Sequence, residues 1–142
     1  MKTYVDTSFL ISLYTADANS QAAALAMRKS PGDHLVSSLG ELETVNALEV
    51  RVFRKEISRA QAGSSWDAFT SDLRDGVFQL RSLPDAAFAR AQLLSRQTTA
   101  RLGIRTADLL HIAAALELEA GCLYSFDQQQ RKLAHALRLK LN

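Results

Sequence analysis

Short, β-prone runs of apolar residues alternate along the chain with longer segments in which apolar residues recur every three or four positions. The short runs predict strands at residues 2–5, 34–36, 77–80, 122–126 and, as an edge strand, 138–141. The periodic segments predict helices at about residues 9–14, 22–28, 38–55, 59–75, 85–98, 107–119 and 128–137. Strands and helices therefore alternate over the whole sequence.

Residues with capping tendencies stand at several of the predicted helix boundaries. Ser58 is placed to cap the helix that Gly76 stops. Ser38 and Glu41 have the Ser-x-x-Glu spacing of a capping box, which assigns Glu41 to the start of the long helix. Thr106 is placed to cap the helix that follows it.

The alternation of strands and helices is typical of an α/β protein. It predicts a three-layer α/β/α sandwich with a central, mostly parallel sheet of four to five strands, formed by residues 1–142 as a single domain. In such a sheet, ligands bind in a crevice at the carboxyl ends of the strands. Side chains that directly follow a strand are therefore candidates for a functional site.

Length and composition exclude several classes of protein. The 142 residues are close to the roughly 150 of one domain, and 47% hydrophobic with 23% charged residues excludes a disordered chain or a fibre. A single cysteine, Cys122, excludes an intramolecular disulfide. The sequence has neither the pattern of a signal peptide nor an apolar run of about 18 residues, so we expect a soluble, cytoplasmic protein. The formal charge of +2 permits nucleic-acid binding without requiring it.

Two acidic residues stand directly after predicted strands. Asp6 follows the first strand and Asp127 follows the fourth. Each could simply cap the next helix, since aspartate is a favoured N-cap residue. In a parallel sheet, however, both would lie at the same edge, where ligands bind. Their joint position favours a functional role.

Glu43 belongs to the apolar face of the long predicted helix. It shares a spacing of three or four residues with Leu39, Leu42, Asn46 and Val50, whereas Glu41 points away from that face. An ionised carboxylate on such a face costs several kcal/mol unless it is paired. No Lys or Arg lies three or four residues away. A buried cation is one way to compensate this charge.

Asp108 lies near the start of a helix that is apolar on nearly all sides. The helix dipole favours aspartate in a first turn, which is a purely structural explanation. His111, three residues further on, shares its face. A single histidine in an apolar helix is more often a hydrogen-bonded core residue than a ligand or a base. We therefore interpret His111 as structural.

Four carboxylates in one crevice would repel one another unless a divalent cation neutralised them. Oxygen ligands favour Mg²⁺ or Mn²⁺ over zinc, and the chain has no Cys and His spacing typical of a zinc site. A carboxylate-bound ion of this kind suits phosphoryl transfer. Phosphodiester hydrolysis is therefore the leading chemistry.

Four segments with these acids resemble the motifs of the PIN-domain ribonucleases, and within them the VapC-like toxins of type II toxin-antitoxin systems. In order, they are YVDTSFL at 4–10, SSLGELETVNAL at 37–48, RTADLLHIAAA at 105–115, and LYSFD at 123–127 followed by LA at 133–134. Each motif is short, but their order and spacing are those of the family over nearly the whole chain. The second motif selects Glu43 over Glu41, in agreement with the helical-face argument.

The resemblance implies a parallel α/β/α sandwich with an acidic Mg²⁺ or Mn²⁺ site that cleaves single-stranded RNA. By position in the motifs, Asp6, Glu43 and Asp108 correspond to the central metal-binding acids, and Asp127 corresponds to a more variable fourth acid. Thr7 and Ser125 would support these carboxylates, although N-cap or strand-end hydrogen bonding explains both residues equally well. The family resemblance also implies a homodimer, a small antitoxin partner and a toxin that inhibits translation and growth.

Basic residues near the predicted site are candidates for RNA backbone binding. They are Arg51 and Arg54 at the end of the long helix, and Arg101 and Arg105 before Asp108. Ordinary charge on a helix surface is the simpler explanation for such residues.

Other functions remain open on sequence alone. A phosphatase of the haloacid-dehalogenase type also places an aspartate after its first strand, but it uses Asp-x-Asp, and Ser8 stands where the second aspartate belongs. A receiver domain needs paired acids after the first strand, which are absent. A catalytically inactive PIN-like binding or assembly module, or a role in RNA processing, would fit the same fold.

Overall fold

The computed structural model describes residues 1–142 and contains one parallel sheet of five strands. The strand order is β3-β2-β1-β4-β5, and every neighbouring pair is parallel. This confirms the predicted α/β class and the number and direction of the strands. The strands are β1 (Lys2–Val5), β2 (Asp33–Ser37), β3 (Gln79–Arg81), β4 (Cys122–Tyr124) and β5 (Lys140–Leu141).

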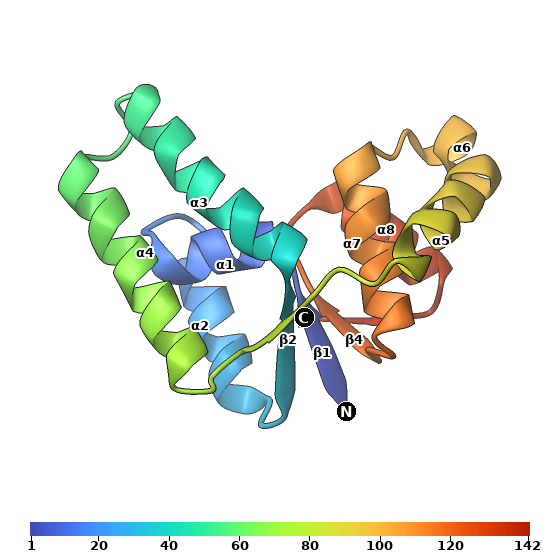
Figure 1. Ribbon diagram of the computed structural model, residues 1–142, viewed down its shortest axis with the longest axis horizontal. Coiled ribbons are helices and arrows are strands. Elements are labelled where there is room, and N and C mark those ends of the chain that lie inside the picture. Colours follow the sequence, from blue (N-terminus) through green and yellow to red (C-terminus); the bar gives the residue numbers. More distant parts are fainter.

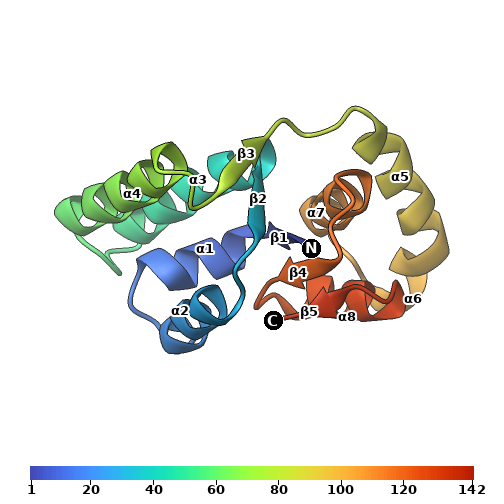
Figure 2. The same ribbon diagram turned by 90° about the horizontal axis from the view of Figure 1, so that it is seen from below.

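Two groups of helices lie on opposite sides of the sheet and complete the predicted sandwich (Figures 1 and 2). The first group consists of α1 (Thr7–Tyr14), α2 (Ser20–Lys29), α3 (Ser38–Phe53) and α4 (Arg59–Arg74). The second consists of α5 (Ala86–Leu94), a π-helical turn η1 (Ser95–Thr99), α6 (Ala100–Leu102), α7 (Thr106–Glu117) and α8 (Gln128–Ala136).

The side chains of the central strands alternate between two hydrophobic cores, as the pleat of a strand requires. Tyr4 of β1 and Leu123 of β4 pack with α5 and α7 on one face. Val5 and Tyr124, their successors along each strand, pack with α1, α2 and α4 on the other. The central strands β1 and β4 are therefore buried on both faces, which explains why successive residues such as Tyr4 and Val5, or Leu123 and Tyr124, can all be buried.

The order of the strands fixes where a ligand can bind. From β1 the chain moves outward through β2 to β3, and it then returns to β4 on the opposite side of β1. The point between β1 and β4 is a topological switch point, and crevices form there at the carboxyl ends of the strands. Asp6 and the segment that precedes Asp127 come directly after these two strands.

Several predicted boundaries are wrong because side chains or turns take the backbone hydrogen bonds. Strand β4 ends at Tyr124, two residues early, because the N–H of Ser125 donates to Asn142 and that of Phe126 donates to Ser8. Strand β3 begins at Gln79, two residues late, because the N–H of Val77 still closes the end of α4. The helix predicted over 85–98 changes into the π-helical turn after Leu94.

The capping predictions have mixed outcomes. Ser58 caps α4 and forms a capping box, with Gln61 as its partner. The predicted box of Ser38 and Glu41 is wrong, because Ser37 caps α3 and the Ser38 hydroxyl instead accepts from the N–H of Leu83. Thr106 is not a cap either, since it is already the first residue of α7.

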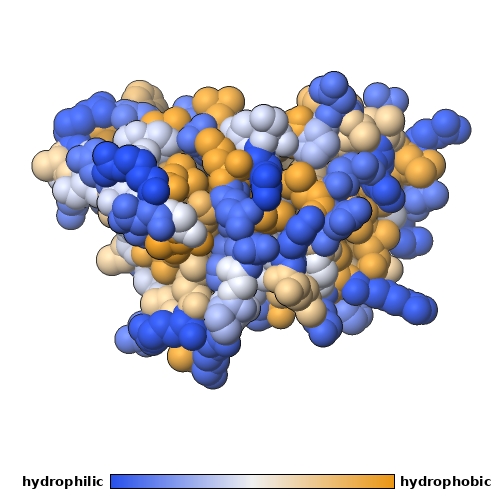
Figure 3. Space-filling model, turned by 60° about the horizontal axis from the view of Figure 1, so that its bottom comes forward, coloured by the Kyte–Doolittle hydropathy of each residue, from blue (hydrophilic) through white to orange (hydrophobic).

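One face of the molecular surface mixes hydrophobic with polar side chains. Figure 3, which brings the bottom of Figure 1 forward, shows hydrophobic and hydrophilic residues interspersed on that face. Phe53 of α3 is the most exposed large hydrophobic residue, followed by Met1 and by Leu42 of α3. None of the helices combines the length and the hydrophobicity needed to cross a membrane.

We expect His34 to make the protein less stable in mild acid. It is buried on β2 between the rings of Phe78 and Tyr124, and its Nε2 has no hydrogen-bond partner. Burial lowers the pKa of His34. The unfolded chain therefore takes up a proton as the pH falls through about 6.5 while the folded protein does not, and stability decreases.

Urea unfolding of the wild type and His34→Leu at pH 7.5 and pH 5.5 checks this prediction. The variant should lose less unfolding free energy between the two pH values than the wild type loses. Equal losses would contradict the prediction.

Candidate functional site

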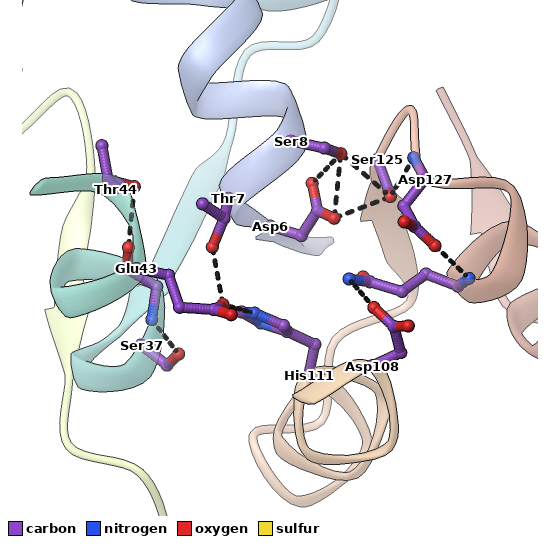
Figure 4. Close-up of polar contacts among 12 residues, drawn as sticks. Asp6, Thr7, Ser8, Ser37, Glu43, Thr44, Asp108, His111, Ser125 and Asp127 are labelled. Carbon is purple, nitrogen blue, oxygen red and sulfur yellow. Dashed lines mark hydrogen bonds and ion pairs between the residues drawn. The ribbon is translucent and has the colours of Figure 1, made fainter. Parts of the chain in front are cut away.

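A polar cavity of about 450 Å³ opens at the carboxyl ends of β1 and β4. All four acidic residues that the sequence singled out, Asp6, Glu43, Asp108 and Asp127, contribute to its lining. They come from four separate segments: the ends of β1 and β4, and the helices α3 and α7 (Figure 4). The fold therefore brings together residues that lie up to 121 positions apart in the sequence, from 6 to 127.

Asp6 is fully buried at the back of the cavity, and neutral donors surround its carboxylate. Oδ1 accepts from the N–H of Phe9 at 2.9 Å, which caps α1, and from the hydroxyl of Ser8 at 2.8 Å. Oδ2 accepts from the hydroxyl of Ser125 at 2.8 Å. Burial raises the pKa of Asp6, although nearby His111 and these donors oppose the rise. A nearby cation would stabilise the ionised form of this buried carboxylate, so Asp6 would bind a cation favourably.

Glu43 projects from α3 and is held through one of its two oxygens. Its Oε1 accepts from the hydroxyl of Thr7 at 2.8 Å and from Nε2 of His111. Partial burial would raise the pKa of Glu43, but the contact with His111, the Thr7 hydroxyl and the charge of Arg105 lower it below its usual value. No Lys or Arg lies three or four residues from Glu43 in the sequence, and the structure shows that His111 of α7 contacts its carboxylate instead.

Asp108 and Asp127 share one guanidinium. Arg105 donates from Nε to Asp108 at 3.0 Å and from Nη2 to Asp127, also at 3.0 Å (Figure 4). The second oxygen of Asp108 accepts from Nε2 of Gln130 at 3.1 Å, and that of Asp127 caps α8 through the N–H of Gln130. Each oxygen of both carboxylates thus accepts one hydrogen bond from the chain itself. No three acidic, histidine or cysteine side chains stand close enough to hold one ion in this arrangement.

The four basic candidates divide into two pairs. Arg51 and Arg105 line the cavity, and Arg51 donates to the hydroxyl of Thr15 at 3.1 Å. Arg54 and Arg101 are exposed and lie outside its lining. The side chain of Arg105 is 70% exposed despite its two ion pairs, so it can turn away from the acids without crossing the protein interior.

Sequence reasoning missed several polar residues of the cavity lining, among them a fifth acidic residue, Asp17, and it interpreted His111 otherwise. Ser8 bonds to Asp6 and Gln130 bonds to Asp108, and neither was singled out. His111 is a buried, hydrogen-bonded residue as expected, but its partners are Glu43 and Tyr4. Ser8, two residues after Asp6, could have been found from the local Asp-Thr-Ser turn. Contacts of His111 and Gln130 depend on the tertiary fold.

Comparisons with known proteins agree with this geometry. Residues 3–136 match the model of the PIN domain family. No curated protein matches the chain in sequence.

Three solved structures illustrate the likeness in fold. VapC20 of Mycobacterium tuberculosis, described as a toxin that cleaves the sarcin-ricin loop, is 19% identical with a TM-score of 0.71, over 94% of each chain. VapBC2 of Rickettsia felis, bound to a promoter DNA fragment, is 17% identical with a TM-score of 0.70, over 100% of this chain and 98% of that one. A toxin-antitoxin complex of Klebsiella pneumoniae is 16% identical with a TM-score of 0.62, over 90% and 88%. The chain therefore belongs to the PIN domain family and has the fold of its VapC toxins.

Proposed function

We propose that this protein is a metal-dependent endoribonuclease that cleaves single-stranded regions of RNA. One observation carries the proposal: four acidic residues from four segments converge on one cavity at the switch point of a PIN-domain sheet. Asp6, Glu43, Asp108 and Asp127 would be its metal-binding and catalytic acids. Their all-oxygen donor set suits Mg²⁺ or Mn²⁺.

The four acids can hold such an ion if the side chain of Arg105 moves away from Asp108 and Asp127. Oε2 of Glu43 has no hydrogen-bond donor in the chain, so it is available without any rearrangement. Asp108 and Asp127 each release an oxygen when the exposed Arg105 turns outward. Bound there, the ion would supply Lewis-acid activation of water and neutralise phosphate charge.

The remaining residues of the site have roles that follow from their contacts. Thr7 and Ser125 hold the carboxylates of Glu43 and Asp6 in place, and they are supporting residues of the site. Arg51 and Arg105 would bind the RNA backbone, because both present guanidinium groups at the cavity. Arg54 and Arg101 would contact RNA only beyond the cavity.

We further propose that the protein is the toxin of a toxin-antitoxin pair, that it forms a homodimer and that it inhibits translation. Solved structures with the same fold include toxin-antitoxin complexes, which supports a small antitoxin protein as partner. A second candidate function, an inactive binding module, is suggested by Arg105, which occupies two of the four acids. The experiments below separate the two.

Purified protein should cleave labelled single-stranded RNA with Mn²⁺ or Mg²⁺ and lose this activity in EDTA. Asp6→Asn and Asp108→Asn should each lower the rate by about 100-fold or more, since several kcal/mol of charge stabilisation would be lost. Gel analysis of a mixed RNA panel measures the rates.

Glu41→Gln is the matched control, because Glu41 lies on the same helix as Glu43 but outside the cavity. It should cleave like the wild type. Metal binding without cleavage, by protein free of antitoxin, would favour the inactive module.

Asp6→Asn should make the metal-free protein more stable, so that its loss of activity is not a loss of folding. The raised pKa of the buried carboxyl means that ionised Asp6 opposes folding at neutral pH. An amide would remove this cost, and we expect a gain of about 1 kcal/mol, or roughly 3 °C in Tm. Thermal unfolding in EDTA at pH 7.5 measures the change. A lower Tm for the variant would contradict this reasoning.

Arg105→Gln should bind Mn²⁺ more tightly than the wild type and bind RNA more weakly. The guanidinium would no longer compete for Asp108 and Asp127. The side chain of Arg105 is 70% exposed, whereas those of Asp108 and Asp127 are 6% and 23% exposed, so the two pairs are worth at least the roughly 1 kcal/mol of a surface ion pair. We therefore expect Kd for Mn²⁺ to fall by about 5-fold or more, as measured by titration calorimetry. Arg101→Gln, which removes an exposed arginine outside the cavity, should leave Kd unchanged. Equal values for both variants would show that Arg105 does not compete.

A further inference from the structure

A chain of buried hydrogen bonds connects the start of α3 with Glu43. The hydroxyl of Ser37 lies 2.7 Å from that of Tyr4, and the Tyr4 hydroxyl lies 2.8 Å from Nδ1 of His111. Nε2 of His111 then contacts Oε1 of Glu43 (Figure 4). Ser37 and Tyr4 are fully buried, and His111 is 1% exposed. This series of hydrogen bonds thus leads from the buried Ser37 to the carboxylate of Glu43 at the cavity.

The partners determine which nitrogen of His111 carries a hydrogen. A carboxylate such as that of Glu43 has no hydrogen to donate, so Nε2 donates to it. The phenol of Tyr4 carries one hydrogen. That hydrogen goes to Nδ1 when the imidazole is neutral, and Ser37 then donates to Tyr4. When the imidazole is charged, Nδ1 donates to Tyr4, which donates to Ser37. In both states Nε2–H faces Glu43.

This contact restricts a flexible side chain. Oε1 of Glu43 accepts two hydrogen bonds, from Thr7 and His111, whereas Oε2 accepts none from the chain. A glutamate loses side-chain entropy when it is fixed in one conformation. Because the donors Thr7 and His111 have already fixed this conformation, an ion that binds Oε2 does not have to order Glu43.

We propose that His111 is a positioning residue that fixes the Glu43 carboxylate for a divalent ion, and that Tyr4 and Ser37 orient the imidazole of His111. The proposal rests on the proposed function, because it concerns the same acidic site. Outer contacts of this type commonly change metal affinity by about 10-fold to 100-fold. A purely structural His111 would instead affect only the stability of the core.

Two substitutions of His111 separate positioning from packing. In His111→Gln the amide nitrogen can take the place of Nε2 and donate to Glu43. In His111→Asn the shorter amide reaches only the position of Nδ1, toward Tyr4. Titration calorimetry with Mn²⁺ at pH 7.5 measures Kd for both variants, and thermal unfolding in EDTA reports their stability. His135→Asn, at an exposed histidine of α8, is the control.

We expect His111→Asn to weaken Mn²⁺ binding by about 10-fold or more, and His111→Gln to remain within about 3-fold of the wild type. An Asn variant that is folded and binds Mn²⁺ like the wild type would overturn the proposal. So would equal losses in the Gln and Asn variants.

If His111→Asn does not fold, Tyr4→Phe provides the test, since it keeps the buried ring and removes only the hydroxyl. It should weaken Mn²⁺ binding by about 3-fold, and unchanged affinity would overturn the proposal. A wild type that binds no Mn²⁺ would refute the proposed function itself. If only the positioning role of His111 is wrong, the wild type still binds Mn²⁺, so the two failures can be told apart.

Discussion

The site depends on a carboxylate that has no contact with solvent, that of Asp6. A buried carboxylate costs several kcal/mol unless each oxygen is hydrogen-bonded. The main chain of Asp6 donates to the carbonyl of Tyr124 at the end of β4, and its side chain caps α1. Hydroxyl donors come from Ser8 on α1 and Ser125 after β4. Satisfying one charge therefore fixes a strand end, a helix start and the adjacent loop relative to one another.

The other three acids are compensated in two different ways. Glu43, whose side chain is 32% exposed, is bonded by Thr7 and by the buried His111. Asp108 and Asp127 are bonded by Arg105, whose side chain is 70% exposed, although their own side chains are only 6% and 23% exposed. Glu43 is therefore held by a residue of the protein interior, whereas the cation that holds the other two acids lies at the surface. The site therefore combines a Glu43 carboxylate held by His111 with two aspartates, Asp108 and Asp127, whose arginine partner a metal ion can replace.

Much of the fold could be predicted from sequence because its determinants are local. Asp6 and Asp127 were placed at one sheet edge by the rule for parallel strands. Glu43 lines the cavity and Glu41 does not, but the predicted apolar core face of this helix is wrong: Leu42 and Asn46 are exposed, and the buried face of α3 is instead Gly40, Thr44 and Leu48. Boundaries failed where distant groups took local hydrogen bonds, as Asn142 does at Ser125 and Leu83 at Ser38.

The contacts inside the cavity could not be predicted because they join residues that are far apart in the sequence. His111 meets Glu43 across 68 residues and Tyr4 across 107. Their approach is set by how α3 and α7 pack on opposite sides of the sheet, which no local pattern encodes. Arg105 lies three residues before Asp108, so a spacing argument could have predicted that ion pair. The second partner of Arg105, Asp127, lies 22 residues away and could not be predicted in this way. The His111–Glu43 contact joins α7 and α3, helices of the two outer layers, at the cavity. A change in the packing of either layer would therefore move Glu43 relative to Asp108, so substitutions well outside the acidic site would change its geometry.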